Sequence, residues 1–262
     1  MKIRFISSNI WGDYFGNEVE TREDQLFRVF DAYAPDVLGM QEATAAWNNS
    51  GLFSRLKETY DFADASAQTK NNFVPLCWRR NAFRLIESGY VQYADTPDPS
   101  KAATWAVLED KASGVRFAAF STHFWYKTFG DPVHDAIRVS NAREMTAQAL
   151  CLREKYGVPV VAFGDLNSRY CDPAIAYLKE NGWQLVRDTA AVTDETASHH
   201  GDPVRGEDGH YHGKTTENRY PVSIDHMLFL GDAVPAEFRV IVDQDALDAT
   251  DHSPILGDLV IG

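Results

Sequence analysis

The chain has 262 residues, 44% of them hydrophobic, and its 25 basic and 38 acidic side chains give a formal net charge of −13. This size and composition support a well-buried core, and the lack of a linker, repeat or low-complexity tract favours one domain over residues 1–262. The acidic balance argues against a general nucleic-acid binder, because phosphate contacts require lysine and arginine, although a local basic groove is compatible with it.

The cysteine pattern and the N-terminal sequence bear on the compartment. Three cysteines, Cys77, Cys151 and Cys171, cannot all pair with one another. Cys77 and Cys151 lie in apolar segments and are expected to be small buried hydrophobes, which fits a reducing compartment. The sequence shows no leader pattern and no apolar run long enough to span a bilayer, so we expect a cytoplasmic protein.

The first predicted elements place polar residues at the ends of apolar strands. Residues 3–9 predict a strand that ends in Asn9, and a helix is expected at residues 21–34. A second strand, at residues 37–40, is followed by Glu42. A glutamate there is costly in a core unless it is paired or bound to a metal, and an exposed strand end is the simpler alternative.

The middle of the chain is rich in predicted strands. A short helix is expected at residues 51–58, and strands follow at residues 73–80, 83–92, 104–109 and 115–123. The last of these strands ends in His123. A lone histidine is more often structural than catalytic, but this one has the same strand-end position as Asn9 and Glu42.

The most informative strand follows a long helix. The helix is expected at residues 134–156, with Arg138 near its start. Residues 160–163 then predict a buried strand, which leaves Asp165 and Asn167 on the loop after its end. Asp165 could orient a water or ligate a cation, and Asn167 can donate to a phosphate oxygen. The alternative is an ordinary Asp-Asn turn.

The next stretch holds half of the chain's eight histidines. A helix at residues 172–181 precedes it, and the irregular residues 192–220 carry His199, His200, His210 and His212. This density would suit a metal, but the spacing matches no closed zinc pattern. We therefore interpret the stretch as a mobile loop on the substrate side.

The last strands are predicted at residues 222–229, 237–242 and 255–261. Asp225 lies inside the first of them, and Asp251 and His252 precede the last. His252 can exchange protons near neutral pH. A buried carboxylate bonded to its ring would fix the tautomer and the orientation.

The strand-end residues share one chemistry. They are carboxylates, carboxamides and histidines, without clustered cysteines or a nucleophilic serine motif. Such a set is typical of phosphoryl chemistry with Mg²⁺ or Mn²⁺, which prefer oxygen ligands. Its members are Asn9, Glu42, His123, Asp165, Asn167, Asp225, Asp251 and His252.

The order of these motifs resembles the endonuclease/exonuclease/phosphatase superfamily, whose fold is that of deoxyribonuclease I. The resemblance rests on Ser8-Asn9, Gln41-Glu42, Thr122-His123, Gly164-Asp165-Leu166-Asn167, Ile224-Asp225-His226 and Asp251-His252-Ser253-Pro254. Residues 88–106 further resemble a bacterial subgroup known only as hydrolases. The resemblance implies an α/β four-layer sandwich of two face-to-face sheets flanked by helices, with the site at one edge.

The resemblance also implies roles for individual residues. Glu42 would hold the metal, Mg²⁺ or Mn²⁺, with help from Asn9 and Asp251. Catalysis of in-line water attack would fall to Asp165, Asn167, His252 with Asp225, and His123. Arg138 matches a recurring arginine on the helix after the histidine strand and is expected on the substrate side, with a core ion pair as the alternative. Beside the resemblance, substrate-side contacts are also expected from Trp125, as an aromatic residue near the motifs, and from His212, in the histidine-rich loop.

Two departures from the subgroup fall beside the expected phosphate site. Asn71 and Asn72 stand where members often carry a glutamate that would orient the histidine matched by His123. Trp125 and Tyr126 stand where members often carry a second histidine. Both departures put the substrate class in question more than the fold.

Three functions remain open from the sequence. A metal-dependent phosphoesterase for a small or lipid-like phosphoester is favoured by the net charge and by aromatic residues near the motifs. A nuclease or DNA-repair endonuclease needs a basic stripe, and the only basic group found is Arg79, Arg80 and Arg84. A non-catalytic binding member of the same fold is disfavoured by the intact motif set.

Overall fold

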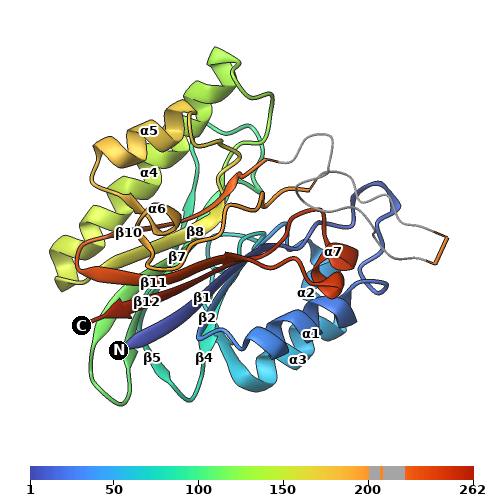
Figure 1. Ribbon diagram of the computed structural model, residues 1–262, viewed down its shortest axis with the longest axis horizontal. Coiled ribbons are helices and arrows are strands. Elements are labelled where there is room, and N and C mark those ends of the chain that lie inside the picture. Colours follow the sequence, from blue (N-terminus) through green and yellow to red (C-terminus); the bar gives the residue numbers. More distant parts are fainter. Residues whose placement is uncertain (201–206, 209–221) are drawn as a thin grey trace.

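Two β-sheets packed face to face form the centre of the molecule, with helices on both outer faces (Figure 1). This computed structural model describes residues 1–200, 207–208 and 222–262. Each sheet has six strands in the described part of the chain. The predicted four-layer sandwich is therefore confirmed. No helix among the described residues is long and apolar enough to cross a membrane.

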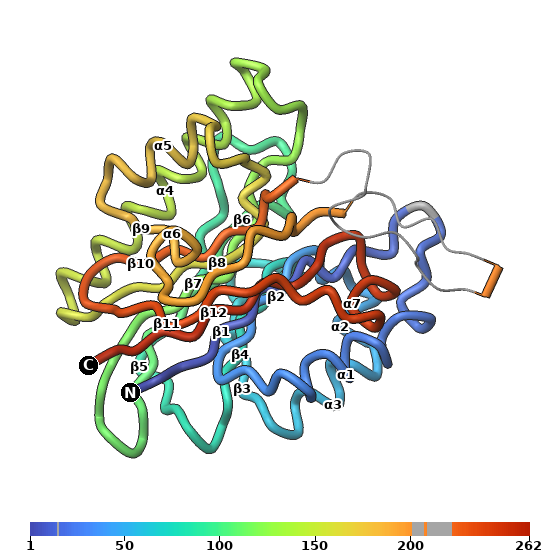
Figure 2. Tube along the Cα trace, viewed as in Figure 1, coloured from blue at the N-terminus to red at the C-terminus, as the bar shows by residue number. Residues whose placement is uncertain are grey.

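The first sheet combines the two ends of the chain with its first third. Its order is β11 (Ala233–Val240), β12 (Ile255–Ile261), β1 (Lys2–Asn9), β2 (Val37–Gln41), β4 (Leu76–Arg79) and β3 (Tyr60–Phe62). Strands β1 and β2 are parallel, and the other neighbours are antiparallel. The pairing of β1 with β12 brings the two termini close together (Figure 2).

The second sheet is built from the middle of the chain. Its order is β5 (Phe83–Gln92), β6 (Ala102–Asp110), β7 (Arg116–His123), β8 (Val160–Asp165), β10 (Asp225–Leu230) and β9 (Gln184–Leu185). Strands β7 and β8 are parallel, and the rest are antiparallel. Each sheet thus contains one parallel pair near its centre.

Amphipathic helices cover the outer faces. On the first sheet these are α1 (Glu23–Tyr33), α2 (Ala45–Asn48), α3 (Gly51–Thr59) and α7 (Gln244–Ala249). On the second sheet they are α4 (Pro132–Tyr156) and α5 (Pro173–Glu180). The short helices η1 (Tyr14–Gly16) and α6 (Val186–Thr189) lie in connections.

Aromatic side chains fill the space between the sheets. The ring centroids of Phe5 and Phe117 lie 5.8 Å apart, and those of Phe5 and Phe163 are separated by the same distance. All three rings are fully buried. Because cores are packed to crystal-like density, this layer fixes the two sheets at one relative position. The residues at the sheet edges are therefore fixed relative to each other as well.

The parallel pairs explain where the polar strand ends meet. In β1 and β2, Asn9 pairs with Gln41, and in β7 and β8, His123 pairs with Asp165. Close approach of β8 to β7 requires Gly164, because a Cβ built there would lie 1.9 Å from the carbonyl oxygen of Thr122. The strand-end side chains of each sheet therefore gather at one edge.

Some local expectations were wrong. Cys77 is buried as predicted, but Cys151 is exposed. The inward face of α4 carries Ala142, Met145, Ala149 and Leu152, at helical spacing, so the neighbouring position 151 faces outward. Strand β10 begins at Asp225 rather than enclosing it. Helices α2, α6 and α7 were not predicted, because they are too short to show a period.

Candidate active site

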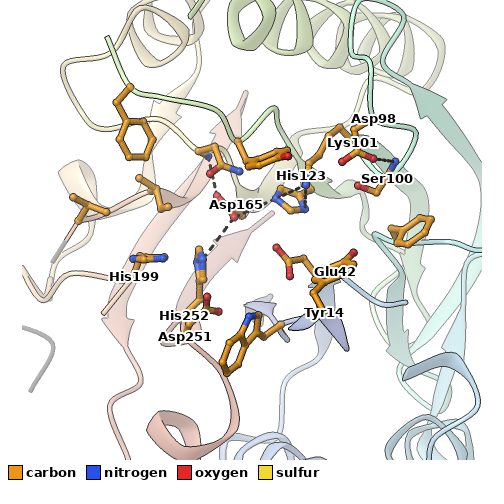
Figure 3. A pocket seen from close by; sticks show the side chains of 17 residues that line it. Tyr14, Glu42, Asp98, Ser100, Lys101, His123, Asp165, His199, Asp251 and His252 are labelled. Atoms are coloured by element: carbon orange, nitrogen blue, oxygen red, sulfur yellow. Dashed lines mark hydrogen bonds and ion pairs between the residues drawn. The ribbon is translucent and has the colours of Figure 1, made fainter. Parts of the chain in front are cut away.

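A cavity of about 680 Å³ opens at the edge where the polar strand ends of both sheets meet (Figure 3). Polar residues line its floor, namely Glu42, Asp98, Ser100, Lys101, His123, Asp165, Asn167, His199, Asp251 and His252. Its remaining walls are apolar or aromatic, formed by Trp11, Tyr14, Phe73, Tyr126, Phe129, Val222 and Ile224. A mostly apolar pocket with a few converging polar groups is typical of a small-molecule site.

Backbone strain is concentrated at this cavity. Four non-glycine residues in the described part of the chain have positive φ, and three of them, Trp11 (53°), Glu42 (61°) and Asn167 (45°), line the cavity. The fourth, Ala34, follows the C-terminus of α1. Such conformations cost roughly 1–3 kcal/mol each and are retained mainly where the surrounding structure and function require them.

Glu42 is held by donors from the end of β1 and from the loop that follows it. Its Oε2 accepts from the backbone N–H of Gly12 at 3.0 Å, and its Oε1 accepts from Nδ2 of Asn9 at 3.2 Å. Burial would raise the pKa of Glu42, but the nearby charges of His123 and Lys101 dominate and lower it. The carboxylate is therefore ionised and directed into the cavity (Figure 3).

Asp165 is the most connected side chain of the site. Its Oδ2 accepts from Nδ2 of Asn9 at 3.1 Å and lies 3.3 Å from Nε2 of His123 and 3.9 Å from Nε2 of His252. Its Oδ1 accepts from the backbone N–H of Asn167 at 2.8 Å. Although burial opposes ionisation, the two histidines and this hydrogen bond hold the pKa of Asp165 well below its usual range.

His252 lies between two carboxylates. Its Nδ1 is 2.8 Å from Oδ2 of Asp225, which also accepts from the hydroxyl of Ser198 at 2.6 Å. Burial would lower the pKa of His252, but Asp225 and Asp165 raise it well above its ordinary value. The ring of His199 packs edge-on against His252 with centroids 4.4 Å apart. Burial, with the charge of His252, lowers the pKa of His199 to about 3.

Asp251 fits a cation. Its Oδ1 is buried and has no hydrogen-bond partner among the described residues. Burial, with the negative charge of Glu42, raises the pKa of Asp251 to about 7, although His252 opposes this shift. An unpartnered buried carboxylate oxygen beside a second carboxylate suits Mg²⁺ or Mn²⁺, which take oxygen ligands. Ligand atoms of His199, Asp251 and His252 lie within 4.8 Å of one another, as do those of Asp165, Asp225 and His252.

Lys101 is a cavity residue that the sequence interpretation missed. Its Nζ lies 3.2 Å from Nδ1 and 3.1 Å from Nε2 of His123, and 5.1 Å from the ring centroid of Tyr126. The only signal for Lys101 in the sequence was its position directly before an apolar strand. The amide of Asn72, one of the two asparagines nearest the glutamate position of the subgroup, hydrogen-bonds Thr104.

Two of the predicted substrate-side residues, Arg138 and Trp125, are not among those lining the cavity. Arg138 is fully buried, forms an ion pair with Asp135 and donates to the carbonyls of Lys127 and Thr128. It therefore positions the loop that carries Tyr126, in line with the core ion pair considered as its alternative. The indole N–H of Trp125 donates to His134. His212 lies outside the described residues, as does most of the predicted histidine-rich loop.

The eight strand-end residues, by contrast, are brought together. Asn9 and Asp225 make the hydrogen bonds to Glu42, Asp165 and His252 described above, and the other members line the cavity. The structure thus gathers one set from segments up to 243 positions apart, Asn9 to His252 (252 − 9).

Comparison with known proteins gives a consistent result. The model of the endonuclease/exonuclease/phosphatase family matches residues 6–252. A protein of this name from Bacteroides vulgatus superposes with a TM-score of 0.79 at 23% identity, covering 100% of both chains. A mannosyl-6-phosphatase from Bacteroides thetaiotaomicron gives 0.74 at 16%, covering 98% and 99%. The human Nocturnin catalytic domain, with a bound sulfate anion, gives 0.74 at 15%, covering 100% and 95%.

These structural likenesses lie below 25% identity and show the fold alone. A search of the curated proteins found no match.

Proposed function

Because the chain belongs to the endonuclease/exonuclease/phosphatase family, whose members are hydrolases that act on phosphoesters, we propose that it is a Mg²⁺- or Mn²⁺-dependent phosphoesterase for a small or lipid-like molecule. The observation that supports this most strongly is the buried carboxylate of Asp165, on the floor of a cavity of about 680 Å³. It accepts hydrogen bonds from Asn9 and Asn167 and lies between His123 and His252. Such a cavity is of the size that holds a small ligand.

The cation would be held by Glu42 and Asp251, with Asn9 beside them. The unpartnered Oδ1 of Asp251 and the ionised Glu42 support this assignment. When bound, the metal neutralises charge on the phosphoryl group and stabilises the leaving oxygen.

The chain's own residues would orient the water and the phosphate. Asp165 stays ionised and accepts a hydrogen bond from the attacking water, which aligns the water with phosphorus. His252 has Nδ1 against Asp225, so its Nε2 is available to donate a proton toward a phosphate oxygen. His123 and the amide of Asn167 supply further hydrogen bonds to the phosphate from the second sheet.

The cavity walls favour a small molecule over nucleic acid. Five aromatic residues, Trp11, Tyr14, Phe73, Tyr126 and Phe129, surround the polar floor and provide stacking surface for a ring or an acyl chain. The basic group found in the sequence is engaged elsewhere: Arg79, Arg80 and Arg84 form ion pairs with Asp36, Asp61 and Glu109. A nuclease remains the second candidate.

Hydrolysis assays on metal-stripped protein test the proposal. The substrates are a p-nitrophenyl phosphomonoester and a phosphodiester, each with and without Mg²⁺ or Mn²⁺. We expect turnover that requires the metal and falls at least about 100-fold in His252→Ala, because a proton donor is lost. Glu42→Ala should weaken Mg²⁺ binding in a calorimetric titration. A matched control is Glu87→Ala, a surface partner of Lys155.

Turnover that survives chelation, or that is unchanged in His252→Ala, contradicts the proposal. Hydrolysis of oligonucleotides in preference to both small esters would support the nuclease instead.

A further inference from the structure

Lys101 is a buried cation at the edge of the cavity floor. The Lys101 side chain and backbone together are only 5% exposed, and Lys101 lies directly before β6 beside His123 (Figure 3). Lysine is almost never buried to this degree unless it is paired. The position therefore needs an explanation, and the roles given above to Asp165, His123 and His252 do not supply one.

No carboxylate among the described residues forms an ion pair with the Lys101 ammonium. The interactions that it does make are to the two ring nitrogens of His123 and to the face of Tyr126. Glu42, Asp98 and Asp165 act on it over longer distances and oppose the lowering of its pKa by burial. A buried charge without a close counter-charge is costly, and an anion bound in the cavity would remove that cost.

The backbone around Lys101 is fixed before any ligand arrives. The N–H of Lys101 donates to the carbonyl of Asp98 at 3.1 Å, and the Asp98 carboxylate accepts from the N–H of Ser100 at 2.9 Å. The carbonyl of Lys101 accepts from Nε2 of Gln92 at 3.0 Å. A preorganised donor loses little entropy on binding, so it contributes more to the affinity for its anion.

We propose that Lys101 binds non-bridging oxygens of the scissile phosphate and makes this enzyme selective for phosphomonoesters over phosphodiesters. This inference rests on the proposed phosphoesterase function and specifies its substrate class. A monoester carries a second negative charge that a diester lacks. The cation held by Glu42 and Asp251 would meet this charge from one side only, so a second cation on the opposite side of the cavity would favour the doubly charged monoester.

The reaction assigned to the site is simple hydrolysis. The oxygen of water bonds to phosphorus, the bond from phosphorus to the alcohol oxygen breaks, and the alcohol takes up a proton in place of the one lost by water. The products are inorganic phosphate and the free alcohol. Lys101 keeps its proton throughout and forms charge-assisted hydrogen bonds, which strengthen as charge gathers on the phosphate oxygens.

Kinetics with two esters of the same leaving group test the proposal. The substrates are p-nitrophenyl phosphate and methyl p-nitrophenyl phosphate, assayed with Mg²⁺. In Lys101→Met, which keeps roughly the length of the side chain, we expect kcat/KM for the monoester to fall about 10- to 100-fold, because a hydrogen bond to a charged group typically contributes that factor. The diester should lose less than about threefold. Lys101→Arg should keep the monoester preference.

Lys127→Met is the matched control. Lys127 is exposed, is not among the cavity residues, and lies over the same Tyr126 ring at 4.5 Å. Its removal should change both rates by less than about twofold, as for other surface substitutions.

Binding of inorganic phosphate separates this inference from the proposed function. Calorimetry on the Mg²⁺-loaded protein should show phosphate affinity at least about tenfold weaker in Lys101→Met than in the parent, at a melting temperature no lower than that of the parent. Equal phosphate affinities, equal losses on both esters, or a parent enzyme that prefers the diester would each overturn the role of Lys101. Inactivity of the parent on both esters would refute the phosphoesterase, and the phosphate titration would still decide whether Lys101 binds the anion.

Discussion

The two sides of the cavity differ in charge. The side built on the first sheet carries Glu42 and Asp251, two carboxylates of which one has an unpartnered oxygen. The side built on the second sheet carries Lys101, His123 and Asn167, which are cationic or hydrogen-bond-donating. Under the function proposed above, the same sandwich edge presents a cation-binding side and an anion-binding side across one space.

Asp165 is the exception that joins the two sides. It belongs to β8 of the second sheet, yet its Oδ2 accepts from Asn9 of the first. A phosphate bound between the sides would meet the metal on one side and donors on the other, with Asp165 at the boundary. Under the proposed function, this separation of charge would let one small cavity hold both a cation and an anion.

The largest effect is expected from neutralising the carboxylate at this boundary. Asp165→Asn keeps the size of the side chain but removes the charge that orients water, so kcat/KM should fall about 10²–10⁴-fold. Steady-state kinetics at saturating Mg²⁺ measure it. Asp188→Asn, which alters a surface ion pair with Lys179, serves as the control. Wild-type rates in Asp165→Asn would remove Asp165 from the mechanism.

The next effect concerns the junction of β7 and β8, which carries the anion-binding side. Gly164→Ala would place a methyl group 1.9 Å from the carbonyl oxygen of Thr122. We expect the free energy of unfolding to fall by about 3–5 kcal/mol, because both strands are buried and cannot separate freely. Urea denaturation measures it. Gly114→Ala, in open space at φ +74°, should cost only about 1 kcal/mol.

A pH-dependent effect is expected on the acidic side. The pKa of Asp251 is raised from 3.8 to about 7 in the folded, metal-free protein. Between pH 3.8 and about 7, the folded form therefore holds a proton that the unfolded form releases. The contribution of this group to stability is fully present below pH 3.8 and is lost as the pH rises through about 7. Asp251→Asn mimics the protonated carboxyl. It should raise the free energy of unfolding of the metal-free protein by about 1–3 kcal/mol at pH 8.

The same comparison has an internal check. The gain in the free energy of unfolding from Asp251→Asn should shrink steadily as the pH is lowered toward about 4, where Asp251 in the folded protein is protonated and therefore as neutral as asparagine. Thermal denaturation in chelator across this range measures it. A gain that is independent of pH would show that the charge of Asp251 is not the cause.

The smallest effect is expected at the exposed rim. Tyr126 is 46% exposed and faces the ammonium groups of Lys101 and Lys127. Tyr126→Leu should raise KM about two- to fivefold with kcat nearly unchanged, because an exposed cation–π contact is worth about 0.5–1 kcal/mol. A fall in kcat larger than the change in KM would place Tyr126 closer to the reaction than the structure does.

Sequence patterns predicted the long elements well and the short ones poorly. The strands at 3–9, 83–92 and 255–261 and the helix at 134–156 match the structure within about two residues, because each has a clear apolar period. Helices α2, α6 and α7 have four to six residues and show no period. Cys151 was placed inside because composition does not reveal which face of a long helix packs.

The candidate site divides in the same way. The sequence by itself determined the inventory of Asn9, Glu42, His123, Asp165, Asn167, Asp225, Asp251 and His252, because each follows or begins an apolar strand and has the chemistry of a phosphoryl site. Through the resemblance of these motifs to the endonuclease/exonuclease/phosphatase family, it also implied the layered α/β fold, with which the predicted strands and helices agree. These are local signals, readable within a few residues.

Only the tertiary structure decided which neighbours each residue has. Lys101 carries no motif, and it becomes significant because β6 and β7 place it against His123. Arg138 was expected at the substrate and instead holds a loop, because its guanidinium is enclosed by carbonyl groups of that loop. Burial and the charge of surrounding groups depend on segments distant in sequence, so they appear only once the sheets have packed.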